Sequence, residues 1–118
     1  MELYKQEFGQ NFNLGFDLSL YPWLIDKSWH NDISPSFYFK TSTGFMVLWV
    51  DYEKPEQRED SEQDRYVVMT AVNSGTDESP EVHHNEDSLQ IFSTEDPRTL
   101  NIFLSNTMGS ITQTQSHT

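Results

Sequence analysis

Residues 44–53, with the sequence GFMVLWVDYE, constrain the fold of this chain more than any other segment. They form the longest run of residues that favour extended structure. In a strand, Val47 and Trp49 would point to one face while Leu48 and Val50 point to the other, so both faces are apolar. A strand with one solvent-exposed face would instead alternate apolar and polar residues. The pattern therefore predicts a central strand that is covered on both sides.

Three further segments have the composition of strands. Residues 35–41 precede the central strand, and the turn signal at 42–44 between the two runs predicts an antiparallel hairpin. Residues 65–72 predict a third strand, which follows a charged loop at 54–64. Residues 88–93 predict a fourth, shorter strand. Residues 1–16 lack a clear period, so we expect an irregular or short-strand segment that adds aromatic rings to the core.

Two helices are predicted, one before the first strand in the sequence and one after the last. Pro22 can occupy the first turn of a short helix, in which Leu20, Trp23 and Leu24 would share one face. Near the other end, Asp96 and Pro97 read as an N-cap followed by proline at the first helical position. Apolar residues then recur at Leu100, Phe103 and Leu104, which predicts a helix over 97–107. The β-branched residues Thr99, Ile102 and Thr107 leave a strand as the alternative.

These elements define an α+β fold. We expect an antiparallel sheet of about four strands, with a short N-terminal helix and a C-terminal helix packed on it. A chain of 118 residues has room for one domain. We place this domain at residues 1–108 and read residues 109–118 as a polar tail.

The charge balance limits the classes of partner. The chain has 19 Asp and Glu residues against 7 Lys and Arg residues, a formal net charge of −12. Nucleic acids and anionic membrane surfaces attract basic proteins, so we expect neither as a partner. No stretch approaches the ~18–20 apolar residues of a membrane span, and the N-terminus lacks a secretion signal. We therefore expect a cytoplasmic protein whose charge serves either solubility or attraction of a basic protein.

Acidic residues gather in two stretches that contain few bases. In the first, Arg58 is a candidate partner for Asp51, in an ion pair that would pin the loop. The other acids of both stretches are our candidates for a surface that contacts a basic partner. These candidates are Glu53, Glu56, Glu59, Asp60, Glu62, Asp64, Asp77, Glu78, Glu81, Glu86 and Asp87.

Signals for catalysis and for metal binding are weak. His30 with Asp32 could form a general base with its orienting carboxylate, but no motif supplies a nucleophile. We therefore read residues 29–32 as a turn, with Trp29 packed in the core and His30 bonded to a carbonyl group. The neighbouring His83 and His84 would point apart in a strand and lack further ligands. We expect no enzyme activity, no metal and no cofactor.

Three motifs resemble a known group of proteins. They are SWHND at 28–32, PSF at 35–37 and LWVDYxxPExRE at 48–59. Together they resemble immunity proteins of bacterial contact-dependent growth inhibition systems, which are encoded beside polymorphic toxins. The resemblance implies a cytoplasmic antitoxin that binds and blocks a cognate C-terminal toxin domain. It implies no particular fold, toxin or interface residue.

The charge and the resemblance agree on a class of function. Many such toxins are nucleases, whose domains are basic because they hold phosphates. A small acidic protein can cover such a surface, so we expect a binding protein that neutralises a basic toxin domain. The alternative is a small-molecule or peptide-binding module, in which Trp23, Trp29 and Trp49 would line a pocket.

Overall fold

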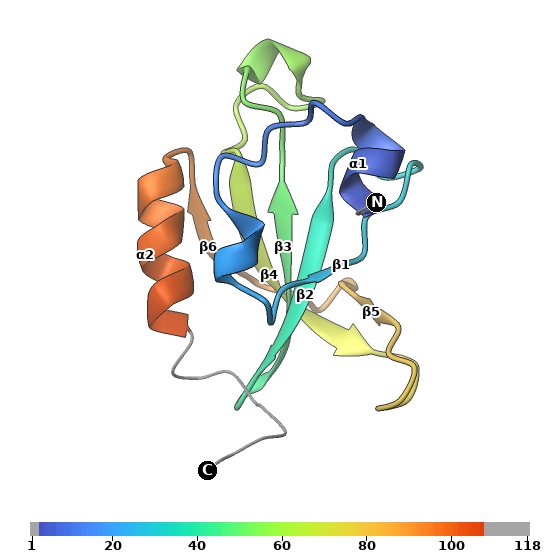
Figure 1. Ribbon diagram of the computed structural model, residues 1–118. Coiled ribbons are helices and arrows are strands. Elements are labelled where there is room, and N and C mark those ends of the chain that lie inside the picture. The colour runs from blue at the N-terminus through green and yellow to red at the C-terminus, as the bar shows by residue number, and fades with distance from the viewer. Residues whose placement is uncertain (1–2, 108–118) are drawn as a thin grey trace.

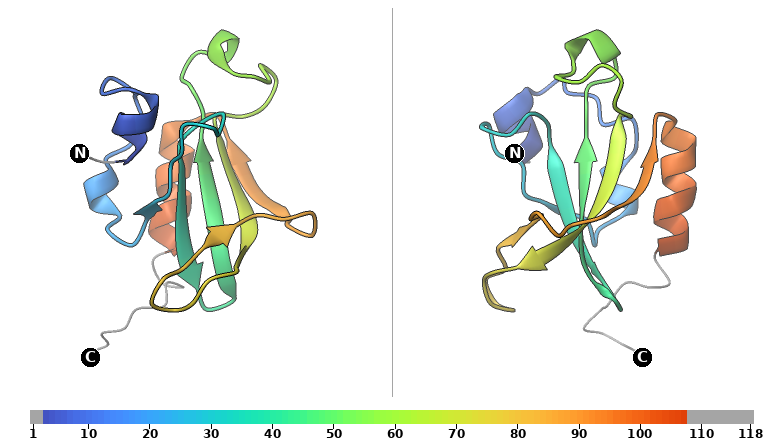
Figure 2. Two further views of the ribbon diagram at one scale, coloured as in Figure 1. Left: turned by 90° about the vertical axis from the view of Figure 1, so that its right-hand side faces the viewer. Right: turned by 180° about the vertical axis from the view of Figure 1, so that it is seen from behind.

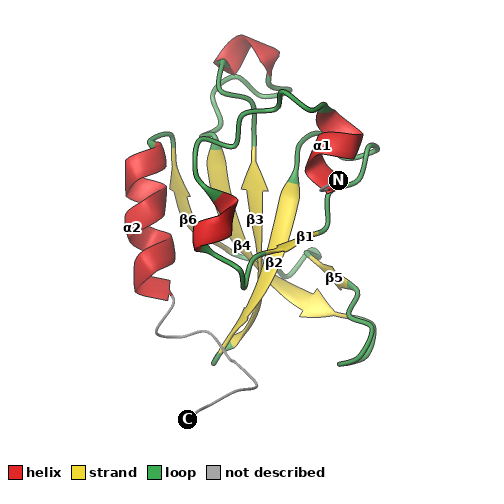
Figure 3. Cartoon of the chain, in the orientation of Figure 1, coloured by secondary structure: helices red, strands yellow, loops and turns green. Residues whose placement is uncertain are grey.

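A six-stranded antiparallel sheet forms the centre of the computed structural model, which describes residues 3–107 (Figure 1). The strand order is β1-β2-β3-β4-β5, and β6 also pairs with β4. β5 pairs with residues 72–73 of β4, and β6 pairs with residues 66–69. The strands are β1 (Ile25–Asp26), β2 (Ser36–Thr41), β3 (Gly44–Val50), β4 (Tyr66–Asn73), β5 (Val82–His83) and β6 (Gln90–Thr94). The helices are α1 (Leu3–Phe8) and α2 (Pro97–Thr107), with short 3-10 turns η1 (Leu18–Leu20) and η2 (Pro55–Gln57) (Figure 3).

The central hairpin follows the prediction. β2 and β3 pair antiparallel with Phe37 opposite Leu48, and their turn closes with Thr41 opposite Gly44. Gly44 has φ +139°, a conformation that residues with a side chain rarely adopt. β3 also pairs with β4, where Leu48 lies opposite Val68. β3 is therefore an interior strand, as predicted, but the expected cover of both faces is incomplete, because Phe45 and Trp49 are only half-buried.

One face of the sheet carries the hydrophobic core. Figure 2 shows the helices and the N-terminal segment on this side of the sheet. Phe37 and Leu48 are fully enclosed there, together with Leu100 and Leu104 of α2. Tyr66 reaches the N-terminal segment, where its hydroxyl donates to Leu14 O at 2.6 Å. Burial raises the pKa of Tyr66 to about 12, so this hydroxyl remains a donor at neutral pH.

The C-terminal element is a helix, as predicted, and not a strand. Asp96 caps it by accepting a hydrogen bond from Arg98 N at 2.9 Å. Phe103 stacks on Phe92 of β6 with ring centroids 4.2 Å apart. The β-branched Ile102 is 63% exposed, so it lies on the solvent side of the helix. The apolar stripe at helical spacing therefore outweighed the local β-preference.

Two expectations for the N-terminal quarter were wrong. The irregular segment contains α1, which is tied to β1 by a hydrogen bond from Tyr4 N to Asp26 Oδ2 at 2.9 Å. No helix forms after Pro22, and the chain instead makes the turn η1, capped by Asp17. Tyr21 ends this turn with φ −129° and ψ 69°, because a residue before proline is driven out of the helical region.

The sheet also has more strands than predicted. β1 and β5 contain two residues each, which is too short for a periodic signal. β6 begins at Gln90, and its register with β4 shifts between Val68 and Met69. The predicted tail at 109–118 lies outside the described residues. Within residues 3–107, neither helix has the length and apolar character needed to cross a lipid bilayer.

Candidate functional site

Arg58 organises the first acidic stretch from the inside. Its guanidinium donates to three backbone carbonyl groups: Nε to Tyr52 O at 2.7 Å, Nη1 to Gln63 O at 2.9 Å and Nη2 to Glu53 O at 3.0 Å. The Arg58 side chain is only 1% exposed. One buried cation therefore fixes the shape of the loop and leaves its carboxylates outside.

The ion-pair partner of Arg58 is Glu95, at the end of β6. Two parallel hydrogen bonds join them, Nη1 to Oε1 at 2.8 Å and Nη2 to Oε2 at 2.7 Å. These bonds lower the pKa of Glu95 and raise the pKa of Arg58. The prediction of an ion pair that pins the loop is confirmed, but its proposed partner Asp51 was wrong. Arg58 acts on Asp51 only through the charge.

The predicted contact residues all lie at the surface, in two separate groups. The first group occupies the loop around η2, which extends above the sheet in Figure 1. The second lies in the loops before and after β5, at the other end of β4. All are exposed except Asp64, which is half-buried. The first group comprises Glu53, Glu56, Glu59, Asp60, Glu62 and Asp64, and the second Asp77, Glu78, Glu81, Glu86 and Asp87.

The structure does not merge these two groups into one patch. The eight residues of β4 separate the loop around η2 from the loop before β5, a length of roughly 26 Å at ~3.3 Å per residue. Screening in physiological salt acts over about 8 Å. Each group therefore has its own local field, and a partner that contacts both would have to span the sheet.

A groove lies between the two groups, on the face of the sheet opposite the core. Its volume is about 450 Å³. Viewed from behind, this side of the sheet carries no helix, and the segment between β5 and β6 crosses it (Figure 2). Val67 and Met69 of β4 and Trp49 of β3 provide apolar lining, and Asp32, Asp51 and Asp64 provide carboxylates. The other lining residues are Asn31, Ile33, Ser34, Gln63, Arg65, His84 and Gln90.

Asp51 is the most buried carboxylate of the groove. It directly follows β3, and Asp51 N donates to Arg65 O at 2.7 Å, so the strand alternation continues to this residue. The residue is 8% exposed, and Oδ1 accepts a hydrogen bond from Tyr52 N at 2.8 Å. Burial raises the pKa of Asp51, while that hydrogen bond and the charge of Arg58 oppose the shift.

Trp49 forms an aromatic wall of the groove with two neighbours. The ammonium group of Lys27 lies 5.5 Å from the Trp49 ring centroid, and the His84 ring meets Trp49 edge-on at 5.7 Å. Burial lowers the pKa of Lys27, whereas the charge of Asp32 raises it. The half-buried indole thus already contacts one cation, which is the contact expected of a cation–π surface.

The segment at the rim of the groove differs from its prediction. Trp29 is 54% exposed and does not belong to the core. His30 Nδ1 lies 2.9 Å from Glu7 Oε1 of α1, rather than at a carbonyl group. Asp32 lines the groove, away from this pair. His30 and Asp32 therefore do not form the orienting pair that general-base catalysis requires.

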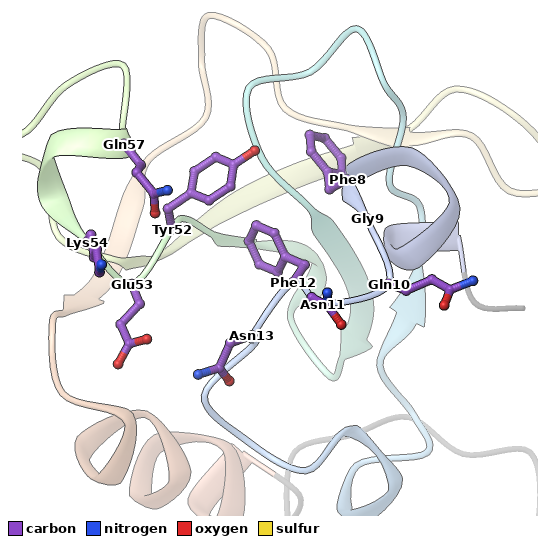
Figure 4. A pocket seen from close by; sticks show the side chains of 10 residues that line it. All are labelled: Phe8, Gly9, Gln10, Asn11, Phe12, Asn13, Tyr52, Glu53, Lys54 and Gln57. Carbon is purple, nitrogen blue, oxygen red and sulfur yellow. The ribbon is translucent and has the colours of Figure 1, made fainter.

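A second hollow lies between the N-terminal segment and the loop around η2 (Figure 4). Its volume is about 370 Å³. The Phe12 and Tyr52 rings lie 5.0 Å apart inside it, with Glu53 and Lys54 at the border. Its lining includes one carboxylate and one ammonium group, so this hollow lacks the charge excess of the groove.

The histidine pair at β5 makes no metal site. His83 Nε2 lies 3.3 Å from Ser74 Oγ, while His84 lines the groove. Among residues 3–107, no group of three or more His, Cys, Asp or Glu side chains could hold a metal ion.

Comparison of the chain with protein-family models, curated proteins and solved structures gave no match. Of the groove's apolar lining, the sequence suggested only Trp49, as one wall of an alternative binding pocket, because Val67 and Met69 have the composition of core residues. A strand face that is only partly covered has the same apolar sequence pattern as a fully covered face, so periodicity cannot distinguish the two. The exposed acids, in contrast, could be found from charge alone.

Proposed function

We propose that this protein binds and neutralises a basic toxin domain, as an immunity protein does in the cytoplasm of a toxin-producing bacterium. One observation carries the proposal. Of the seven Lys and Arg residues, Arg58 and Arg65 are buried and bonded inside the protein, whereas the predicted acidic contacts are exposed or half-exposed. The buried Asp51 and Glu95, the partner of Arg58, offset these two arginines, so the outer surface keeps the full acidic excess of the sequence.

Electrostatics supply the mechanism. A field of one sign raises the association rate of an oppositely charged partner by about 10–10³-fold at low salt. The loop that Arg58 holds in place presents its carboxylates in a fixed arrangement, so little conformational entropy is lost on docking. An acidic surface placed over a phosphate-binding site would exclude the nucleic acid substrate. Such inhibition requires no catalytic group and no cofactor.

A second candidate function is supported by the groove itself. Its aromatic wall and apolar lining fit a small-molecule or peptide-binding module. Of the three indoles expected to line a pocket, only Trp49 lines the groove, whereas Trp23 packs against the core and Trp29 is exposed. A saturable ligand that does not compete with a toxin domain would favour this function.

Charge reversal tests the leading proposal in the loop around η2, which we call the pinned loop because Arg58 holds it in place. The change is Glu59→Lys, Asp60→Lys and Glu62→Lys together, at three exposed positions. We expect the association rate with the toxin domain of the neighbouring reading frame to fall about tenfold or more at low salt. The salt dependence of that rate should also flatten. Stopped-flow fluorescence across a salt series measures both quantities.

The matched control reverses the same number of charges at the other end of β4, at Asp77, Glu78 and Glu81. Because the pinned loop adjoins the groove through Gln63 and Asp64, we expect the control to have the smaller effect. Unchanged association in both triple variants would refute the acidic contact surface. Absence of any binding by the unaltered protein would refute the proposed function.

A further inference from the structure

Asp51 has no ion-pair partner in the described part of the chain, although the residue is only 8% exposed. Among residues 3–107 its Oδ2 accepts no hydrogen bond, and no ion pair involves it. The two nearby arginines are occupied. Arg58 pairs with Glu95, and Arg65 Nη2 donates to Asn13 O at 2.6 Å. A buried carboxylate normally has a partner, so the open side of Asp51 in the groove indicates where one would bind.

The lining around Asp51 defines the shape and chemistry of that partner. Met69 and Trp49 are half-buried and offer apolar surface to the groove, and Val67, which is 3% exposed, forms its floor between them. A lysine or arginine side chain combines an aliphatic stem with a charged head, which suits an apolar path that ends at a carboxylate. An anion or a fully apolar group would leave Asp51 without a partner.

The surrounding charge favours the same occupant. Asp32, Asp51 and Asp64 all line the groove. Of the cations near it, Lys27 lies over the Trp49 ring and Arg65 donates to Asn13 O, and neither forms an ion pair with Asp51. On the 29–34 segment, the exposed Ile33 lines the groove and the exposed Trp29 lies nearby, where they can contact the surface of a protein.

We propose that this groove receives one lysine or arginine side chain of the protein partner, with its stem on Trp49, Val67 and Met69 and its cationic head at Asp51. The inference rests on the proposed function, because it identifies where a basic partner makes its most buried contact. The acidic loops would attract the partner, and the buried pair at Asp51 would slow its dissociation.

A tripeptide probe tests the groove without the toxin domain. The probe is acetyl-Ala-Arg-Ala-amide, and its neutral counterpart carries citrulline in place of arginine. We expect the arginine peptide to shift the indole N–H resonance of Trp49 in a saturable manner in ¹⁵N NMR spectra. Asp51→Asn should weaken this binding about tenfold. Asp64→Asn, at a half-buried lining position, should weaken it less, and Asp77→Asn, far from the groove, should leave it unchanged.

The outcomes distinguish a failure of the groove inference from a failure of the proposed function. Equal binding of the arginine and citrulline peptides, or equal binding by wild type and Asp51→Asn with intact spectra, would overturn the inference. If Asp51→Asn fails to fold, the Asp64→Asn series decides in its place. A toxin domain that binds wild type and Asp51→Asn equally well would refute the groove but not the function. A groove that binds the arginine peptide in a protein that binds no toxin domain would refute the function alone.

Discussion

The two faces of the sheet are built from the same strands but differ in how completely they are covered. On the core face, Phe39 is 1% exposed and Leu48 is fully enclosed. On the opposite face, Phe45, Trp49 and Met69 remain half-buried. The first face has the helix α2 and the N-terminal segment over it, whereas the second is crossed by the segment between β5 and β6 and bordered by residues 31–34 (Figure 2).

This difference indicates that one face of the β-sheet mainly stabilises the fold, whereas the other leaves surface available for binding. Residues that face the core contribute stability through burial, at ~25 cal/mol per Å² of apolar surface. On the opposite face Val47 and Val67 are also buried, but Phe45, Trp49 and Met69 contribute less, because they keep part of their surface in contact with water. That remaining surface is available to a partner, and it surrounds the carboxylate of Asp51.

The largest expected effect comes from removing one aromatic ring from each face. Phe39 of β2 and Phe45 of β3 are matched in chemistry but lie on opposite faces. We expect Phe39→Ala to lower the free energy of unfolding by about 3–5 kcal/mol, the range for a fully buried phenylalanine. Phe45→Ala should cost about 1 kcal/mol. Urea denaturation measures both, and equal losses would show that the two faces are equally buried.

A smaller effect is expected where the pinned loop joins the sheet, at Glu95. Glu95→Gln removes the charge that pairs with Arg58, and we expect a loss of about 1 kcal/mol at neutral pH, since Glu95 is half-exposed. The pKa of folded Glu95 lies below its ordinary value of 4.5. The stabilisation is therefore complete above 4.5 and disappears as the pH falls through the folded pKa.

The measurement is a pH series of urea denaturation on wild type and Glu95→Gln. The control is Glu62→Gln, which makes the same chemical change at an exposed position of the same loop. It should change the unfolding free energy by less than about 0.5 kcal/mol at any pH. A difference between wild type and Glu95→Gln that persists unchanged at low pH would contradict the ion-pair assignment.

The predictable part of the fold consists of elements whose pattern is long enough to read. β2, β3, β4 and α2 were found because their apolar residues repeat over five or more positions. The two-residue strands β1 and β5 have no such repeat. Their pairing depends on β2 and β4 being present first, so it is a tertiary property.

The candidate site was predictable only in its charge. Composition located the exposed acids and the need for an ion pair around Arg58. It did not identify Glu95, which follows Arg58 by 37 positions and meets it only because β6 pairs with β4. The groove depends in the same way on Asp32, Asp51 and Asp64 being brought together from distant parts of the chain.

The central claim is that Asp51 serves binding at the expense of stability, and Asp51→Asn tests it most directly. Burial raises the pKa of Asp51 above its ordinary value of 3.8. Its ionisation therefore costs stability above the folded pKa, and this cost vanishes below 3.8. Asparagine removes the charge and keeps an oxygen that can accept from Tyr52 N.

The decisive measurement is urea denaturation of wild type and Asp51→Asn, at neutral pH and again below pH 3.8. At neutral pH, both proteins are also measured in the presence of the arginine tripeptide. We predict that the variant is more stable than wild type at neutral pH and equally stable at low pH. The peptide should stabilise wild type, as any ligand of the native state does, and have a much smaller effect on the variant. A variant that is less stable at neutral pH, yet gains as much from the peptide as wild type, would contradict the account.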